Sequence, residues 1–182
     1  MVRRQIAALA FAVSVGLGLS HALCYSTQLP VQVASHCDAT GAPAAWTARS
    51  TLIDIQLTVI TVLAAAFALL AGILIKSPAR WFSLPNRQWW LAPERSDETR
   101  CDLACRILWL GTVTQIFVLD LFHHAVRVNR GRAPQQENVW PDVIGFLVLV
   151  GIRFGLILLR YARRPAAASS IARYCSPMAV RV

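Results

Sequence analysis

Four long apolar segments alternate with shorter polar connections along the chain. A helix that crosses the hydrocarbon core of a bilayer needs roughly 20 apolar residues, because each residue advances the helix by about 1.5 Å. The segments that reach this length are residues 5–24, 52–75, 104–126 and 142–160. The pattern predicts an all-α fold: one integral membrane bundle of four transmembrane helices within residues 1–164, followed by a basic tail over residues 165–182.

The composition supports a membrane protein and excludes several other classes. Of the 182 residues, 56% are hydrophobic and only 15% are charged, whereas a soluble domain carries about 25% charged residues. Such a chain has too few charged residues to cover a water-soluble globule, and it is too apolar to be disordered. The five cysteines are too few for a disulfide-dense fold.

The basic residues indicate an orientation. The chain has 18 Lys and Arg against 9 Asp and Glu, a net charge of +9. The two termini and the loop between the second and third helices carry 13 of these basic residues, and the other two loops carry 4. By the positive-inside rule, both termini are predicted to be cytoplasmic. Because the basic residues flank apolar segments and do not alternate with stacking aromatic residues, we do not expect nucleic acid as a partner.

The first apolar segment has an alternative interpretation as a cleaved signal peptide. Arg3 and Arg4 precede it, and Ser20 and Ala22 place small residues at both positions of a cleavage site. The segment is long for a signal peptide, so a transmembrane helix is favoured. Cleavage would leave three helices with the same outer loop outside.

Two loops carry unusual sequence patterns. The outer loop, residues 29–46, has the pattern LP-x-x-VA-x-H followed by Gly, Pro and Trp, formed by Leu29, Pro30, Val33, Ala34, His36, Gly41, Pro43 and Trp46. The inner loop, residues 83–99, reads SLPNRQWWLAPERSDET and contains Leu84, Pro85, Asn86, Trp89, Trp90, Leu91, Ala92, Pro93, Glu94 and Arg95. Over about the first 105 residues the chain resembles a bacterial membrane family known as domain of unknown function 1648. Ser83, Trp89 and Cys37 depart from the usual residues of that family.

This resemblance implies an integral protein of the bacterial inner membrane and no known reaction. The same outer domain occurs in Sdp-type immunity and signalling proteins. From the resemblance we therefore expect a partner-binding or sensing function.

Asp120 and Arg153 are ionisable residues inside predicted spans, where a charge is costly and is expected to have a partner. On antiparallel helices their side chains lean toward each other, which predicts a pair that fixes the packing of the third and fourth helices. Two alternatives remain: a role in proton or ion movement, and an Arg153 side chain that reaches lipid phosphate. Asp120 also shares a polar stripe with His123, and His124 lies on its flank.

The Asp and His spacing on this helix is a weak metal signal, and we expect no metal and no other cofactor. Adjacent histidines at a helix end are more often interfacial anchors. Asp54 and Gln56 are the nearest further side chains that a metal site would recruit.

Cys24 and Cys37 both lie on the predicted outer side, where an oxidising environment permits a disulfide between them. His36 is adjacent to Cys37, but adjacent residues of an extended segment point to opposite sides and do not form a catalytic pair.

The inner loop combines aromatic and basic side chains. These suit a segment in the anionic headgroup layer, or a docking site for a protein or a lipid headgroup. Ser96, followed by Asp97 and Glu98, predicts that the third helix begins in the cytoplasm.

The chain contains no catalytic or phosphate-binding motif, so we expect a protein that is not an enzyme. The leading hypothesis is a partner-binding, sensing, immunity or signalling component, in contact with the lipid bilayer and with a membrane or cytoplasmic protein. The alternative is a small carrier or an ion or proton pathway through Asp120, His123, His124 and Arg153. Because four helices enclose little space, a homo-oligomer is expected in that case.

Overall fold

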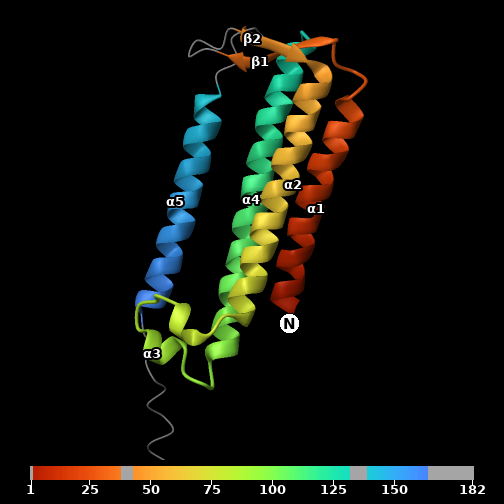
Figure 1. The fold of residues 1–182 in the computed structure, drawn as a ribbon. Helices are drawn as coiled ribbons and strands as arrows, with labels where there is room; N and C mark the ends of the chain where they lie inside the picture. Colours follow the sequence, from red (N-terminus) through yellow and green to blue (C-terminus); the bar gives the residue numbers. More distant parts are fainter. Residues whose placement is uncertain (1, 38–42, 132–138, 164–182) are drawn as a thin grey trace, which may run out of the picture.

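The computed structural model describes residues 2–37, 43–131 and 139–163. Four long helices run antiparallel to their sequence neighbours (Figure 1). They are α1 (Val2–Tyr25), α2 (Arg49–Lys76), α4 (Ser96–Asn129) and α5 (Trp140–Ala162). Each contains one of the predicted apolar segments and extends beyond it, which confirms the number and place of the four helices. All four are long and apolar enough to cross a membrane.

The two ends of the bundle differ (Figure 1). A two-stranded sheet of β1 (Gln32–Cys37) and β2 (Pro43–Ala48) lies at one end. The one-turn helices η1 (Ala79–Trp81) and α3 (Arg87–Trp90) lie at the other end, where α1 begins and α5 ends. We refer to these as the hairpin end and the α3 end.

Helix α4 is the longest element, with 34 residues. At about 1.5 Å per residue it is about 51 Å long, which exceeds the roughly 30 Å hydrocarbon core. It begins at Ser96, as the sequence predicts, and the acidic Asp97 and Glu98 occupy its first turn. Acidic groups interact favourably with the positive end of the helix dipole, so they stabilise this end of α4.

The β-hairpin corrects the prediction of a purely helical fold. The strands pair antiparallel, from Gln32 with Ala48 to Cys37 with Pro43, with irregularities on both sides of His36. The Asn129 side chain, at the end of α4, bonds the main chain of Ala34 twice: Oδ1 accepts from its N–H at 2.6 Å, and Nδ2 donates to its carbonyl at 3.1 Å. The polar main chain of β1 is thus satisfied by β2 and by α4, contacts that no local pattern reveals.

Helices α1, α2 and α4 form the tightly packed core. Gly18 of α1 lies so close to Ile60 of α2 that an added Cβ would come within 2.8 Å of the Ile60 Cδ1 atom. At Gly111 of α4, an added Cβ would lie 2.7 Å from a ring atom of Phe11 and 2.9 Å from one of Phe67. Small residues at these two crossings allow the helix backbones to approach, a feature that is typical of membrane helix bundles.

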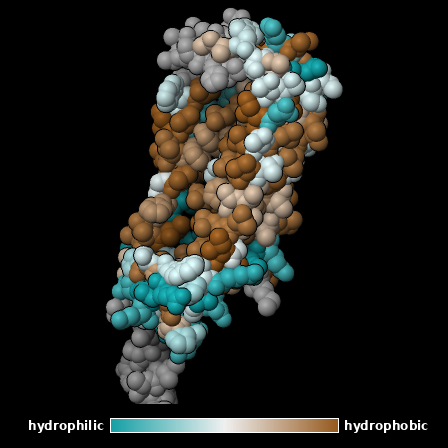
Figure 2. All heavy atoms as spheres, in the orientation of Figure 1, coloured by the Kyte–Doolittle hydropathy of each residue, from teal (hydrophilic) through white to brown (hydrophobic). Residues whose placement is uncertain are grey.

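Helix α5 lies beside this core. Tyr161 is the one residue of α5 that is buried, and most of its leucine, isoleucine and valine side chains are exposed. Figure 2 shows apolar side chains over the middle of the bundle and polar side chains gathered at the α3 end. The exposed apolar surface of α5 therefore suits contact with lipid.

Candidate functional site

Helix α5 is attached to α4 near both of its ends. Toward the hairpin end, the rings of Phe117 and Phe146 stack with centroids 4.1 Å apart, and His124 Nε2 lies 3.2 Å from an Asp142 carboxylate oxygen. At the α3 end, Tyr161 contacts α4 and the loop that precedes it. The segment of α5 between these two attachments borders a cavity.

The attachment at the α3 end is centred on Asp102. The Tyr161 hydroxyl donates a hydrogen bond to Asp102 Oδ2 at 2.7 Å. The same oxygen accepts from Arg106 Nε at 2.8 Å and lies 3.4 Å from Arg160 Nε. Sequence reasoning missed this group, although the i, i+4 spacing of Asp102 and Arg106 is a known helix ion-pair signal.

The inner-loop motif packs over the last turn of α5. Trp90 Nε1 donates to the Tyr161 carbonyl at 2.9 Å, and Asn86 Nδ2 donates to the Ala162 carbonyl at 2.7 Å. These carbonyls have no partner within their own helix, so the loop caps α5. Asn86 has a φ of 54°, a left-handed conformation that asparagine tolerates better than most residues. The Trp90 carbonyl accepts from the Thr99 hydroxyl at 2.7 Å, which ties the loop to α4.

The expectation that the aromatic side chains of this loop lie in the headgroup layer is therefore wrong for Trp90. This side chain is buried, and its ring meets the Tyr161 ring edge-on at 5.0 Å. Trp89 is half-buried beneath the Arg95 guanidinium, which lies 4.2 Å from its ring centroid. Among the other motif residues, Leu84 is half-buried and the exposed ones are Pro85, Pro93 and Glu94.

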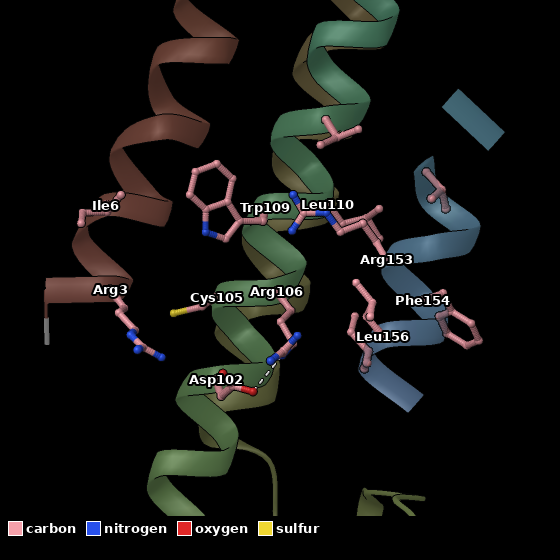
Figure 3. A pocket seen from close by; sticks show the side chains of 13 residues that line it. Arg3, Ile6, Asp102, Cys105, Arg106, Trp109, Leu110, Arg153, Phe154 and Leu156 are labelled. Atoms are coloured by element: carbon pink, nitrogen blue, oxygen red, sulfur yellow. Dashed lines mark hydrogen bonds and ion pairs between the residues drawn. The ribbon is translucent and has the colours of Figure 1, made fainter. Parts of the chain in front are cut away.

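A cavity of about 370 Å³ opens between α4 and α5 in the half of the bundle toward the α3 end. Its walls are mainly apolar, and three arginines enter it (Figure 3): Arg3 of α1, Arg106 of α4 and Arg153 of α5. The remaining lining residues are Ile6, Asp102, Cys105, Trp109, Leu110, Val113, Val150, Phe154, Leu156 and Ile157.

A second cavity, of about 810 Å³, lies at the foot of the first. The two share Arg3, Asp102 and Cys105. Further arginines line the second cavity, together with two acidic and two tryptophan side chains: Arg4, Arg95, Arg160, Arg163, Glu98, Asp102, Trp89 and Trp90. The pair of cavities therefore has an apolar upper part and a strongly basic foot.

The arginines of the upper cavity differ in their partners. Arg106 is neutralised by Asp102. Arg3 and Arg153 form no ion pair with any residue in the described part of the chain. Figure 3 shows the Arg153 side chain extending from α5 toward α4, beside Leu110. Two cations thus line an apolar wall without a counter-ion among the residues that the structure describes.

The predicted pair of Asp120 with Arg153 is wrong. Asp120 Oδ2 lies 3.6 Å from His124 Nε2, and Asp142 joins them from α5. Asp142 lies in the first turn of α5, and its carboxylate is within 4.8 Å of the Asp120 carboxylate. Arg153 follows Asp142 by eleven residues, about 16 Å along the helix, and reaches the cavity toward the α3 end instead.

The predicted polar stripe on α4 divides between two faces. His123 and His124 are successive residues, so they point about 100° apart around the helix. His124 faces α5, whereas His123 faces α1, where its Nδ1 lies 3.3 Å from His21 Nε2. Gln56 of α2 is buried, and its Nε2 lies 3.0 Å from His21 Nδ1. Gln56 therefore belongs with His21 and His123 and not with His124. Asp54, the other side chain that a metal site was expected to recruit, is exposed on α2.

The outer-loop motif lies at the hairpin end of the bundle. Leu29 is buried, and its carbonyl accepts a hydrogen bond from Arg49 Nη1 at 2.9 Å. Pro30 and Trp46 are exposed. The backbones of His36 and Pro43 take part in the strands, and their side chains, like Gly41, lie outside the described residues.

Cys24 is free and exposed, so the disulfide with Cys37 that the sequence permits is not formed in the structure. Cys37 is the last residue of β1, and its side chain lies outside the described residues.

No protein-family model matches the chain, and neither does any curated protein or solved structure. The resemblance to the domain of unknown function 1648 therefore stays a prediction.

Proposed function

We propose that this protein is a non-enzymatic binding and sensing protein of the bacterial inner membrane, with an anionic amphiphile as its ligand. The observation that carries the proposal is the cavity between α4 and α5, where Arg3 and Arg153 line an apolar wall without a carboxylate partner among the described residues. The amphiphile is a molecule with one negatively charged headgroup and an apolar chain.

The position of Arg153 favours a bound anion. It lies nine residues before the end of α5, about 14 Å into the helix. An arginine at the centre of a transmembrane helix costs about 2.5–3.5 kcal/mol on insertion scales, and a counter-ion offsets this cost. A guanidinium also matches phosphate and carboxylate groups with two parallel hydrogen bonds.

The shape of the paired cavities suits the two parts of such a ligand. The volume of about 370 Å³ in the upper cavity is typical of small-molecule sites, which span about 300–1,000 Å³. Its apolar walls fit an acyl chain, and the arginines around the foot fit a headgroup at the level of the membrane surface.

The proposed topology places this site at the cytoplasmic leaflet. With both termini in the cytoplasm, the α3 end faces the inner surface of the membrane, where a basic segment gains attraction from anionic lipids. Helix α5 touches the rest of the bundle mainly near its two ends. An occupant of the cavity would therefore change the separation between α4 and α5. Such a movement would signal occupancy to a membrane or cytoplasmic protein partner.

The alternative function, an ion or proton pathway, receives no specific support. It requires Asp120, His123, His124 and Arg153 to act together, and these residues lie in three different groups.

The proposal is tested by native mass spectrometry of the full chain, purified in detergent. The delipidated protein is incubated with phosphatidylglycerol or with phosphatidylcholine. We expect retention of phosphatidylglycerol and a loss of about tenfold or more in its affinity in Arg153→Gln, since a hydrogen bond to a charged group contributes about 1.5–3 kcal/mol. Arg87→Gln is the matched control, because Arg87, the first residue of α3, is exposed and lines neither cavity.

A second arm uses laurate in place of the phospholipid. Preference for laurate would identify a free amphiphile, and preference for phosphatidylglycerol would identify a bilayer lipid; both support the proposal. Equal retention of phosphatidylglycerol and phosphatidylcholine, or equal effects of Arg153→Gln and Arg87→Gln, would overturn it.

A further inference from the structure

Asp120, His124 and Asp142 form a compact group between α4 and α5 near the hairpin end. His124 Nε2 lies 3.2 Å from Asp142 Oδ2 and 3.6 Å from Asp120 Oδ2. One donor atom from each of the three residues lies within 4.8 Å of the other two. The group is separate from the arginine-lined cavities, whose linings include none of its members.

The separations of 3.2 Å and 3.6 Å between His124 Nε2 and the two carboxylates match the coordination shell of a small divalent ion. Zn²⁺ binds histidine nitrogen and carboxylate oxygen at about 2.0–2.2 Å, so two ligands at tetrahedral angles lie about 3.3–3.6 Å apart. Asp120 and His124 are four residues apart and therefore lie on one face of α4, as pairs of helix-borne ligands do. Asp142 completes three ligands from the first turn of α5.

The charges of the group also favour a cation. Two carboxylates and one imidazole carry a net charge of −1 even when the imidazole is protonated. His124 is the only basic group within ion-pair distance of either carboxylate in the described part of the chain. A divalent ion bound to a neutral imidazole brings the site to zero charge, the favourable state near an apolar layer.

We propose that Asp120, His124 and Asp142 bind one divalent transition-metal ion, with Zn²⁺ as the probe. A nitrogen donor beside two oxygen donors favours ions of this class over Mg²⁺ and Ca²⁺, which prefer oxygen-only shells. Three protein ligands leave one coordination position for water.

The site joins two helices that have few other contacts at this end. The bound ion crosslinks α4 to α5 one helix turn beyond the stacked rings of Phe117 and Phe146. It thereby sets the position of α5 from the hairpin end, while Tyr161 and Asp102 hold it at the α3 end.

The experiment measures Zn²⁺ bound per chain by elemental analysis and by competition with a metal indicator. It uses the full chain, expressed without a polyhistidine tag and stripped with a chelator. We expect one ion per wild-type chain and an affinity at least about tenfold lower in His124→Gln and in Asp142→Asn. The matched control is His123→Gln, which removes the adjacent histidine that faces α1 and keeps the site. No bound Zn²⁺ in the wild type, or equal losses in His123→Gln and His124→Gln, would overturn the proposal.

A second pair of variants does not depend on loss of binding. His124→Cys replaces the nitrogen ligand with a thiolate, so Co²⁺ bound at the site is expected to show a thiolate-to-cobalt charge-transfer band. His123→Cys adds a cysteine one residue away and is expected to show none beyond the wild-type signal. Equal bands in both variants, or no band in His124→Cys, would also contradict the metal site.

Discussion

The hydrogen bond from Tyr161 to Asp102 is the contact whose removal tests the attachment of α5 most directly. Tyr161 is 1% exposed, and its hydroxyl lies 2.7 Å from Asp102 Oδ2. Tyr161→Phe removes one oxygen atom and keeps the ring against Trp90, 5.0 Å away. Any effect on stability therefore reports the hydrogen bond and not the packing of the ring.

Its magnitude follows from the partners that Asp102 retains. A hydrogen bond to a charged group contributes about 1.5–3 kcal/mol, and one between transmembrane helices about 0.6 kcal/mol on average. Arg106 still donates to Asp102 at 2.8 Å after the substitution, so the carboxylate is not left unpaired. We expect Tyr161→Phe to lower the free energy of unfolding by about 1–2 kcal/mol, a factor of about 5–30 in the folded population.

The assay is a double-mutant cycle of Tyr161→Phe and Asp102→Asn, with reversible unfolding measured in mixed micelles. A coupling energy of about 1 kcal/mol is expected for a direct bond. Tyr25→Phe serves as the control, because the Tyr25 ring packs on His21 at 4.6 Å and its hydroxyl has no hydrogen bond among the described residues. A coupling energy below about 0.5 kcal/mol, or an equal loss in Tyr25→Phe, would refute the role assigned to this bond.

Two further predictions concern the core and the hairpin. Gly111→Ala places a Cβ 2.7 Å from Phe11, so we expect a loss of about 1–3 kcal/mol in the free energy of unfolding. Gly151→Ala on α5, where nothing lies within 4 Å, is expected to cause no loss in the same micelle assay, and equal effects of the two would contradict this account. Asn129→Ala removes both hydrogen bonds to the Ala34 main chain, each of which contributes about 1 kcal/mol. We therefore expect amide hydrogen exchange in β1 to be roughly tenfold or more faster than in the wild type. Unchanged exchange would show that the hairpin does not depend on Asn129.

The sequence alone determined the four helices and much of their extent. The length of an apolar segment is a local property, and a membrane converts it directly into a helix because every main-chain group must be bonded within the segment. For the same reason the start of α4 at Ser96 could be predicted, since the acidic first turn is a local signal.

Only the tertiary structure decided which polar groups meet. Helical periodicity placed Asp120 and His123 on one side of α4, but in the bundle His123 meets His21 of α1, whereas Asp120 lies beside His124 and Asp142. The level at which α5 begins then gave Asp120 and His124 the partner Asp142 in place of Arg153. Trp90 shows the same dependence, because the end of α5 that buries it lies 71 residues further along the chain. Partners of this kind depend on the relative rotation and height of packed helices, which are set by contacts across the bundle and not by the pattern of any one segment.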